Sequence, residues 1–286
     1  MTTYLLALGV ARLLAGLPLV VWYRISDAGA WILEHLVQYR REVISENLAR
    51  AFPQRNPREL KALRRAFYRN FTDIIVEAVK SLGLSAAQFR KHYYLENPEV
   101  FQQLYRQGRG VIMVMGHQNN FEWTAMGIPL LVPQRCFAVY HPLKSPVMNR
   151  LVVRVRERFG LQLFPMKETY PFMLHNPEPA PLYVFMADQS PRRKKTRYQA
   201  SFLGRKTPVH LGVENLARDC DLAVVFLEVA RERRGRYRAR ARLLRQDTRD
   251  LPQYQVTDEH VKALEQMIYR DPANWLWSHK RWKHAG

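Results

Sequence analysis

The chain has little cysteine, and it lacks the common zinc-binding and nucleophile motifs. Only Cys136 and Cys220 occur in 286 residues, and their spacing fits neither a disulfide framework nor a metal cluster. The nine histidines form no H-E-x-x-H pattern, and we find no serine or cysteine elbow, internal repeat, low-complexity tract or linker. We therefore expect an intracellular protein in a reducing compartment whose chemistry uses neither a metal nor an organic cofactor.

The sequence also lacks an uninterrupted apolar run of full transmembrane length. The longest apolar segment, from Tyr4 to Trp22, contains Arg12 near its middle and Pro18 near its end. No Lys or Arg precedes it and no A-x-A site ends it, which argues against a cleaved signal peptide. We expect residues 1–23 to form a membrane-anchoring helix that crosses the bilayer obliquely or lies in the interface, with a buried core helix as the alternative.

Positive charge is in large excess. Lys and Arg number 45 against 25 Asp and Glu, which gives a formal net charge of +20. Such a field attracts anionic partners and strengthens contact with membrane phospholipids. The chain shows no recognition helix, zinc knuckle or aromatic RNA-binding strand, so we expect no nucleic acid partner. The basic run Arg192–Arg197 and the arginines between Arg231 and Arg242 are the densest charges, and both need an anionic partner or free solvent.

Alternating apolar and amphipathic segments predict an α/β domain over residues 24–286. Asn56-Pro57-Arg58-Glu59 is typical of a helix start, and an apolar stripe continues this helix to about Gly83. Further helices are expected from Ser85, from Asn97 and over 146–159. Strands are expected at 110–115, 135–140, 161–164, 182–186, 222–229 and 237–244. Because helices interleave with the strands, we expect a central mixed, mostly parallel sheet covered by helices.

His117 and Glu122 are the strongest candidates for catalysis. The apolar strand ending at Met115 delivers the histidine onto a turn, and a helix beginning near Asn119 would bring the carboxylate within reach of the imidazole. A histidine and an orienting carboxylate form a general base that can activate a hydroxyl directly. By itself the H-x4-E pattern is weak, since a satisfied histidine at a strand end is about as common.

Six sequence blocks, in order along the chain, carry a resemblance to a known family. They are Tyr39–Pro53, Met115–Trp123, Tyr140–Pro146, Ala187–Gln189, Phe202–Gly204 and Trp275–Lys283. In this order they resemble the late acyltransferases of lipid A biosynthesis, the lauroyl and myristoyl acyltransferases, which form part of the lysophospholipid acyltransferase-like superfamily. The glycerolipid branch usually carries Asp at the second position of the catalytic pair, so Glu122 favours the lipid A branch.

The resemblance implies transfer of a fatty acyl chain from acyl carrier protein to a hydroxyl of a lipid A precursor. It implies a place at the cytoplasmic face of the inner membrane, with His117 as the base and Glu122 as its orienting carboxylate. The predicted substrate-binding residues are Arg156, Asp188, Gln189, Lys144 and Asn120. Backbone amides near Asn119 and Asn120 are expected to stabilise the oxyanion, with help from Arg156.

Two alternatives remain open at this point. A related acyltransferase acting on a lysophospholipid or an aminolipid would keep the same catalytic pair. A basic, non-catalytic membrane or nucleic acid binder would need neither residue. The cluster of Trp275, Trp277 and Trp282 is equally consistent with contact at the lipid headgroups and with packing at the end of the domain.

Overall fold

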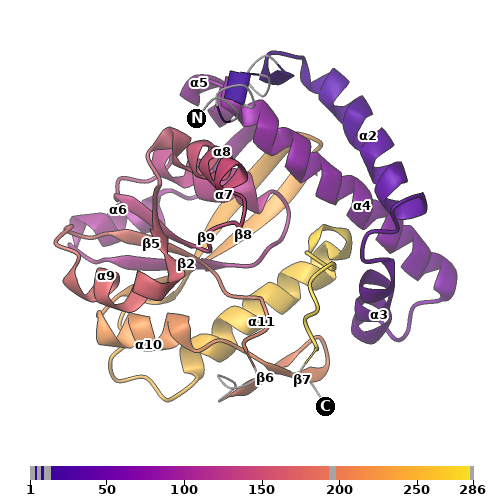
Figure 1. The fold of residues 1–286 in the computed structure, drawn as a ribbon. Coiled ribbons are helices and arrows are strands. Elements are labelled where there is room, and N and C mark those ends of the chain that lie inside the picture. Colours follow the sequence, from indigo (N-terminus) through magenta and orange to yellow (C-terminus); the bar gives the residue numbers. More distant parts are fainter. Residues whose placement is uncertain (1–3, 5–7, 10–13, 193–197, 284–286) are drawn as a thin grey trace.

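Seven strands form one twisted sheet in the order β1-β9-β8-β2-β5-β3-β4 (Figure 1). The computed structural model describes residue 4, residues 8 and 9, and residues 14–192 and 198–283. The strands of this sheet are β1 (Tyr93–Leu95), β2 (Val111–Met115), β3 (Cys136–Tyr140), β4 (Gln162–Pro165), β5 (Leu182–Met186), β8 (Ala223–Arg233) and β9 (Arg236–Arg245). All neighbouring strands are parallel except β8 and β9. The predicted α/β class with a mixed, mostly parallel sheet is confirmed.

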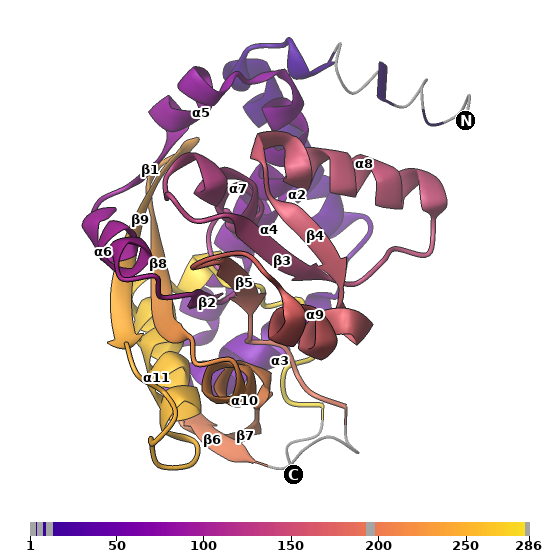
Figure 2. The same ribbon diagram turned by 90° about the vertical axis from the view of Figure 1, so that its left-hand side faces the viewer.

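Helices cover both faces of the sheet (Figures 1 and 2). They are α2 (Leu19–His35), α3 (Arg41–Ala51), α4 (Pro57–Lys80), α5 (Ala86–His92), α6 (Glu99–Arg106), α7 (Phe121–Gly127), α8 (Pro146–Arg156), α9 (Thr169–His175), α10 (Gly212–Asp219) and α11 (Gln255–Arg270). Short 3₁₀ turns occur at Ser81–Gly83, Ile128–Leu130, Glu157–Phe159, Met166–Glu168 and Pro272–Asn274. A small antiparallel pair, β6 (Gln199–Phe202) and β7 (Arg205–Pro208), packs beside α11.

Alternate residues of the strands fill two separate cores. Ile112 and Val114 of β2 point toward the core beneath α3, α10, α11 and the C-terminal segment, whereas Val111, Met113 and Met115 point toward α5, α6 and α7. All five residues of β2 are buried, so this central strand is apolar throughout, as parallel strands covered on both faces usually are.

Several predicted elements are confirmed almost to the residue. Helix α4 begins after Asn56, whose side chain accepts hydrogen bonds from the backbone N–H groups of Arg58 and Glu59, while Glu59 accepts from the N–H of Asn56. Ser85 and Gln88 form the same reciprocal cap at the start of α5. These caps satisfy backbone donors that would otherwise have no partner, which explains why the capping pattern predicted both helix starts.

The N-terminal segment differs from the expected division at residue 23. Helix α2 runs through that position, and its Trp22, Ser26 and Ala30 are buried against the domain. Within the described residues, no helix is long and apolar enough to cross a membrane. Much of the predicted anchor, at residues 1–3, 5–7 and 10–13, lies outside the described residues. The membrane-anchoring helix therefore stays a prediction.

The fully buried carboxylate of Glu77 connects four elements of the fold. Glu77 of α4 accepts hydrogen bonds from the hydroxyls of Tyr23 (2.9 Å) and Tyr237 (2.8 Å) and from Nδ2 of Asn120 (2.6 Å). Its backbone oxygen accepts from Nε1 of Trp123. Burial raises the pKa of Glu77 to about 7 even though its hydrogen bonds favour the charged form. This network ties α2, α4 and β9 to the start of α7.

Candidate active site

His117 stands just beyond the carboxyl end of β2, and Asp188 just beyond that of the neighbouring strand β5. Met115 of β2 pairs with Met186 of β5 in parallel register, so residues two positions beyond each strand end are brought side by side. Gly116 allows this approach, because a Cβ there would lie 2.5 Å from Cδ1 of Leu264 and 3.3 Å from Oδ2 of Asp188.

Asp188 holds the imidazole of His117 in one orientation. Nδ1 of His117 lies 2.6 Å from Oδ1 of Asp188, and the backbone N–H of His117 donates to Oδ2 at 2.8 Å. The Asp188 side chain is 3% exposed, whereas the His117 side chain keeps 15% of its surface open. With Nδ1 protonated and bonded to Asp188, Nε2 keeps the lone pair that a general base requires, and Nε2 of Gln189 lies 3.4 Å from it.

The electrostatics of this pair favour a charged carboxylate and a more basic histidine. Burial by itself disfavours the imidazolium, but the charge of Asp188 and its hydrogen bond outweigh burial and raise the pKa of His117. Burial likewise opposes the Asp188 carboxylate, yet His117 and the hydrogen bonds from His117 N and Trp275 Nε1 lower its pKa well below the ordinary value. Asp188 is therefore ionised whenever His117 is able to accept a proton.

Glu122 does not make the predicted contact with the imidazole of His117. It accepts two hydrogen bonds from Arg156 of α8, with Nε to Oε2 at 2.8 Å and Nη2 to Oε1 at 2.5 Å. Helix α7 begins only at Phe121, so Glu122 lies in its first turn and contacts Arg156 of α8. The register of β2 and β5 brings Asp188, instead of Glu122, next to Nδ1 of His117. Both members of the Glu122–Arg156 pair still lie close enough to His117 to influence its pKa.

The remaining predicted residues lie in three different surroundings: beside His117, on the exposed surface, and in the protein interior. Gln189 belongs to the site, since its Nε2 lies 3.4 Å from Nε2 of His117. Lys144 is exposed in the connection between β3 and α8. Asn120 is buried, where Nδ2 donates to Glu77 and Oδ1 accepts from the N–H of Trp123, so its side chain caps α7. The side chain of Asn120 is thus engaged within the protein, and the predicted substrate contact of this residue stays a prediction for its backbone N–H.

The predicted oxyanion-stabilising amide of Asn119 is also engaged inside the protein. Its N–H donates to the carbonyl oxygen of Asn274 at 2.8 Å, and its side chain donates to the carbonyl oxygen of Val229. Asn119 itself has a positive φ of 53°, a conformation that asparagine tolerates better than most residues. The Asn119 amide is therefore a structural donor in this conformation, and the backbone N–H of Asn120 and the guanidinium of Arg156 remain as the predicted oxyanion donors.

A C-terminal segment that the sequence did not connect with catalysis supports the site. Trp275 Nε1 donates to Oδ2 of Asp188 at 2.8 Å, and the N–H of Leu276 donates to the carbonyl oxygen of His117 at 3.0 Å. His279 Nε2 accepts from the N–H of Ser190 at 3.0 Å. Burial lowers the pKa of His279 to about 4, which keeps this nitrogen unprotonated near neutral pH. Thus Trp275 is a buried partner of the site and not a residue at the headgroups.

Most arginines of the β8–β9 hairpin have carboxylate partners, and these partners belong to the protein itself. Arg231 and Arg234 both bind Asp73, and Arg234 also binds Asp27. The alternation along β9 is as predicted, with Tyr237, Ala239 and Ala241 buried between arginines. Further pairs are Arg236 with Glu232, Arg238 with Glu96, and Arg245 with Glu259. Of the basic run 192–197, residues 193–197 lie outside the described residues.

Among the described residues, no group of three or more His, Cys, Asp or Glu side chains is arranged to hold a metal ion. The chemistry available from the described side chains at the site is proton transfer by His117, assisted by the charges of Asp188, Glu122 and Arg156. This combination suits the attack of a hydroxyl on a carbonyl carbon, where one proton must leave and one oxygen must gain negative charge.

Comparison with known proteins adds an independent line of evidence. The model of the bacterial lipid A biosynthesis acyltransferase family matches residues 1–284. The chain is 23% identical over 282 residues to the lipid A biosynthesis palmitoleoyltransferase of Escherichia coli (strain K12), covering 96% of this chain and 89% of that protein. The lipid A biosynthesis acyltransferase of Shigella flexneri matches with the same identity and coverage.

The hydrogen bond from Trp275 to Asp188 yields a first prediction. In Trp275→Phe the ring stays but the donor is lost, so the carboxylate becomes a stronger base toward His117. We expect kcat/KM to fall about tenfold, since a hydrogen bond to a charged group contributes roughly 1.5–3 kcal/mol, and the acidic limb of the pH–rate profile to move to higher pH. Trp282→Phe is the matched control, because it removes a buried indole donor that binds Thr207 instead. An unchanged pH profile in Trp275→Phe would show that the indole only fills space.

A second prediction concerns the Glu122–Arg156 pair. Glu122→Gln and Arg156→Gln should each reduce kcat/KM by about tenfold or more, because a bidentate pair positions both groups. The double variant should lose little more than either single variant. Arg109 and Asp221 form a matched bidentate pair before β2 and β8, at the opposite edge of the sheet. If the effects of Glu122→Gln and Arg156→Gln simply add, or do not exceed those of Arg109→Gln and Asp221→Asn, the two residues do not act as one unit in the site.

Proposed function

Because the chain belongs to the bacterial lipid A biosynthesis acyltransferase family, we propose that this acyltransferase moves a fatty acyl chain from acyl carrier protein to a hydroxyl of a lipid A precursor. The observation that carries the proposal is the His117–Asp188 pair, in which Nδ1 is bonded to the buried carboxylate and the imidazole stays partly exposed. The membership fixes the kind of reaction, and the geometry suggests which residues perform it.

His117 acts as the general base. Its Nε2 takes the proton of the acceptor hydroxyl while the hydroxyl oxygen attacks the carbonyl carbon of the donor thioester. The tetrahedral intermediate then collapses, the carbon–sulfur bond breaks, and the imidazolium returns the proton to the leaving thiolate. Asp188 keeps Nδ1 protonated throughout and stabilises the transient imidazolium, and the raised pKa of His117 suits both transfers.

Three further residues are assigned to substrate. Gln189 lies beside Nε2 of His117 and would contact the acceptor hydroxyl or the thioester. Arg156, held by Glu122, would stabilise either the developing oxyanion or a phosphate of the acceptor. Lys144, exposed on the connection before α8, is suited to a more distant phosphate. In this scheme Asp188 is the orienting carboxylate, while Glu122 acts through Arg156.

We further propose that the enzyme works at the cytoplasmic face of the inner membrane, where its lipid acceptor would be found. The excess of 45 Lys and Arg over 25 Asp and Glu favours both an acidic carrier protein and anionic phospholipids. A lysophospholipid or an aminolipid is the second candidate acceptor, because the site geometry fixes the proton transfer but not the shape of the lipid. The hypothesis of a non-catalytic binder is wrong, since the chain belongs to an acyltransferase family.

A direct assay tests this proposal. Purified protein should transfer the acyl chain of an acyl carrier protein thioester to a phosphorylated diglucosamine lipid, in preference to a lysophospholipid, an aminolipid or an acyl-coenzyme A donor. His117→Ala should lower turnover by about 10²-fold or more, which is the usual contribution of a general base. Preference for another acceptor would contradict the proposed lipid A precursor, and preference for acyl-coenzyme A would contradict the proposed carrier protein donor. Near-normal turnover in folded His117→Ala would remove His117 from the mechanism.

The raised pKa of His117 predicts the pH dependence of the reaction. A general base must be unprotonated, so kcat/KM should fall as the pH is lowered through a value above the ordinary histidine pKa of about 6.5. In Asp188→Asn the charge that raises the pKa of His117 is gone, so burial lowers that pKa. The acidic limb should therefore shift to lower pH while maximal turnover drops. Thr207→Val, a buried polar substitution away from the pair, should leave the limb in place. An Asp188→Asn profile identical in shape to that of the wild type would contradict the assignment.

A further inference from the structure

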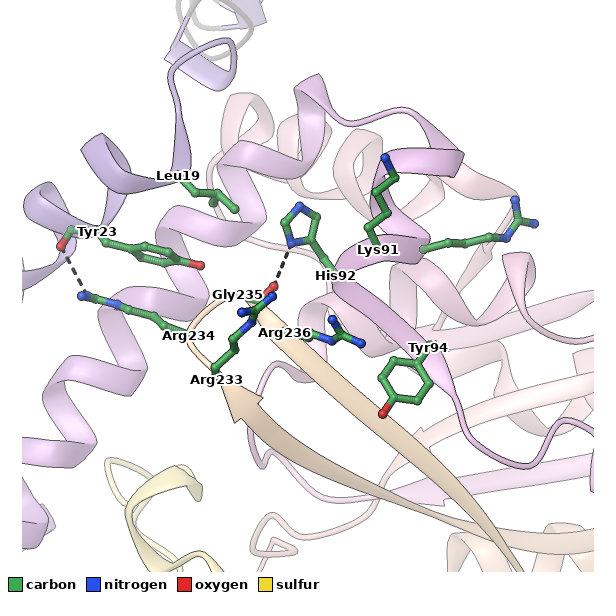
Figure 3. A pocket seen from close by; sticks show the side chains of 10 residues that line it. Leu19, Tyr23, Lys91, His92, Tyr94, Arg233, Arg234, Gly235 and Arg236 are labelled. Atoms are coloured by element: carbon green, nitrogen blue, oxygen red, sulfur yellow. Dashed lines mark hydrogen bonds between the residues drawn. The ribbon is translucent and has the colours of Figure 1, made fainter.

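A basic cavity of about 830 Å³ lies apart from His117, where the start of α2, the end of α5, the start of β1 and the β8–β9 turn meet (Figure 3). Its lining includes five cationic side chains: Arg90, Lys91, Arg233, Arg234 and Arg236. Leu19 and Tyr23 of α2 form its apolar wall. Nothing in the proposed acyl transfer uses these residues.

The cations of this cavity are unequally compensated. Arg234 binds Asp27 and Asp73, and Arg236 binds Glu232. By contrast, Lys91 and Arg233 are exposed, and their side chains have neither an ion-pair nor a hydrogen-bond partner among the described residues. The cavity therefore retains positive charge after its internal pairs are formed, and mutual repulsion between neighbouring cations favours an anionic ligand.

The cavity is partly preorganised by its aromatic residues. The guanidinium carbon of Arg234 lies 4.4 Å from the ring centre of Tyr23, and that of Arg236 lies 5.8 Å from the ring centre of Tyr94. His92 Nδ1 is 2.8 Å from the carbonyl oxygen of Gly235, which ties α5 to the hairpin turn. Gly235 itself has φ 74°, and a Cβ there would lie 2.2 Å from the Tyr23 hydroxyl. The turn is thus fixed against α2, and the cationic rim has a defined shape.

The helix that walls the cavity also exposes an unusual number of large apolar side chains. Val20 is 70% exposed and Trp31 is 54% exposed, and Val21, Ile25 and Ile32 lie on the same outward side of α2. The inner side of this helix is already packed against the domain through Trp22, Ser26 and Ala30. Apolar residues on the outer side of an amphipathic helix, next to clustered Lys and Arg, are typical of a helix lying in a membrane interface.

We propose that this cavity binds the phosphate of an anionic membrane lipid while the outer side of α2 lies in the membrane interface. The charge selects the phosphate, and the adjoining apolar residues select a lipid over a soluble acidic protein. In Figures 1 and 2 the start of α2 and α5 lie at the same end of the molecule, so the elements that line the cavity adjoin the exposed apolar side of α2. The inference rests on the membrane placement proposed above and not on the acyl-transfer chemistry.

The test compares two lipids rather than total membrane binding. Full-length protein is mixed with vesicles of phosphatidylcholine, with or without one third phosphatidylglycerol, and bound protein is measured by co-sedimentation. The N-terminal apolar segment contributes to both partition coefficients, so their ratio isolates recognition of the anionic lipid. Lys91→Glu/Arg233→Glu should lower this ratio about tenfold or more, since each cation near an anionic surface contributes about a factor of five. Lys91→Arg/Arg233→Lys should preserve it.

Arg240→Glu/Arg242→Glu is the matched control, because it reverses two exposed arginines of the same hairpin outside the cavity. An equal loss of the ratio in both charge-reversal variants would show that only the overall surface charge matters, and no loss in the cavity variant would also overturn the proposal. An unchanged ratio with a raised KM for acyl carrier protein would reassign the cavity to the carrier. His117→Ala should bind vesicles like the wild type, so failure of the catalytic proposal is measured separately.

Discussion

The parallel pairing of β2 with β5 is the constraint on which the candidate site depends. Met115 and Met186 are neighbours in this register, which brings His117 and Asp188 to the same point at the carboxyl edge of the sheet. A shift of one residue would turn every side chain of β2 to the other face and separate the pair. The apolar residues on both faces of β2 make that shift costly, so the two cores that stabilise the fold also fix the geometry of the His117–Asp188 pair.

Several buried polar groups make this position rigid. Asp188 is buried, and it stays charged because the imidazole and the backbone N–H of His117 and the indole N–H of Trp275 all donate to it. On the other side, Glu77 joins Asn120 to Tyr23 and Tyr237, and Asn120 begins the helix that carries Glu122. Each of these groups would be costly to bury without its partners, so removing one partner destabilises more than a single bond. The site is therefore supported by residues distant in sequence.

The sequence predicted the sheet well and the contacts of the site only in part. Apolar runs located β2 and β5 closely, and capping patterns located α4 and α5, because these signals are local. The spacing of His117 and Glu122 suggested a direct contact, yet the contact is made by Asp188. The two predicted strand ends already held this information, since both residues follow their strands at the same offset. The roles of Trp275, His279 and Glu77 had no such signal, because their contacts depend on tertiary packing.

Tertiary packing also decides how much of the positive charge is left for external partners. A net charge of +20 suggested a broad surface for anionic partners, but Asp73, Asp27, Glu96 and Glu232 neutralise much of the β8–β9 hairpin from within. The hairpin arginines thus tie β8 and β9 to α2, α4 and the segment after β1. Lys91 and Arg233 beside the basic cavity, and Arg240 and Arg242 farther along β9, have no carboxylate partner among the described residues. Because screened attraction acts over only about 8–10 Å at physiological salt, unpaired cations of this kind act on anions close to them, while the summed charge mainly accelerates encounter.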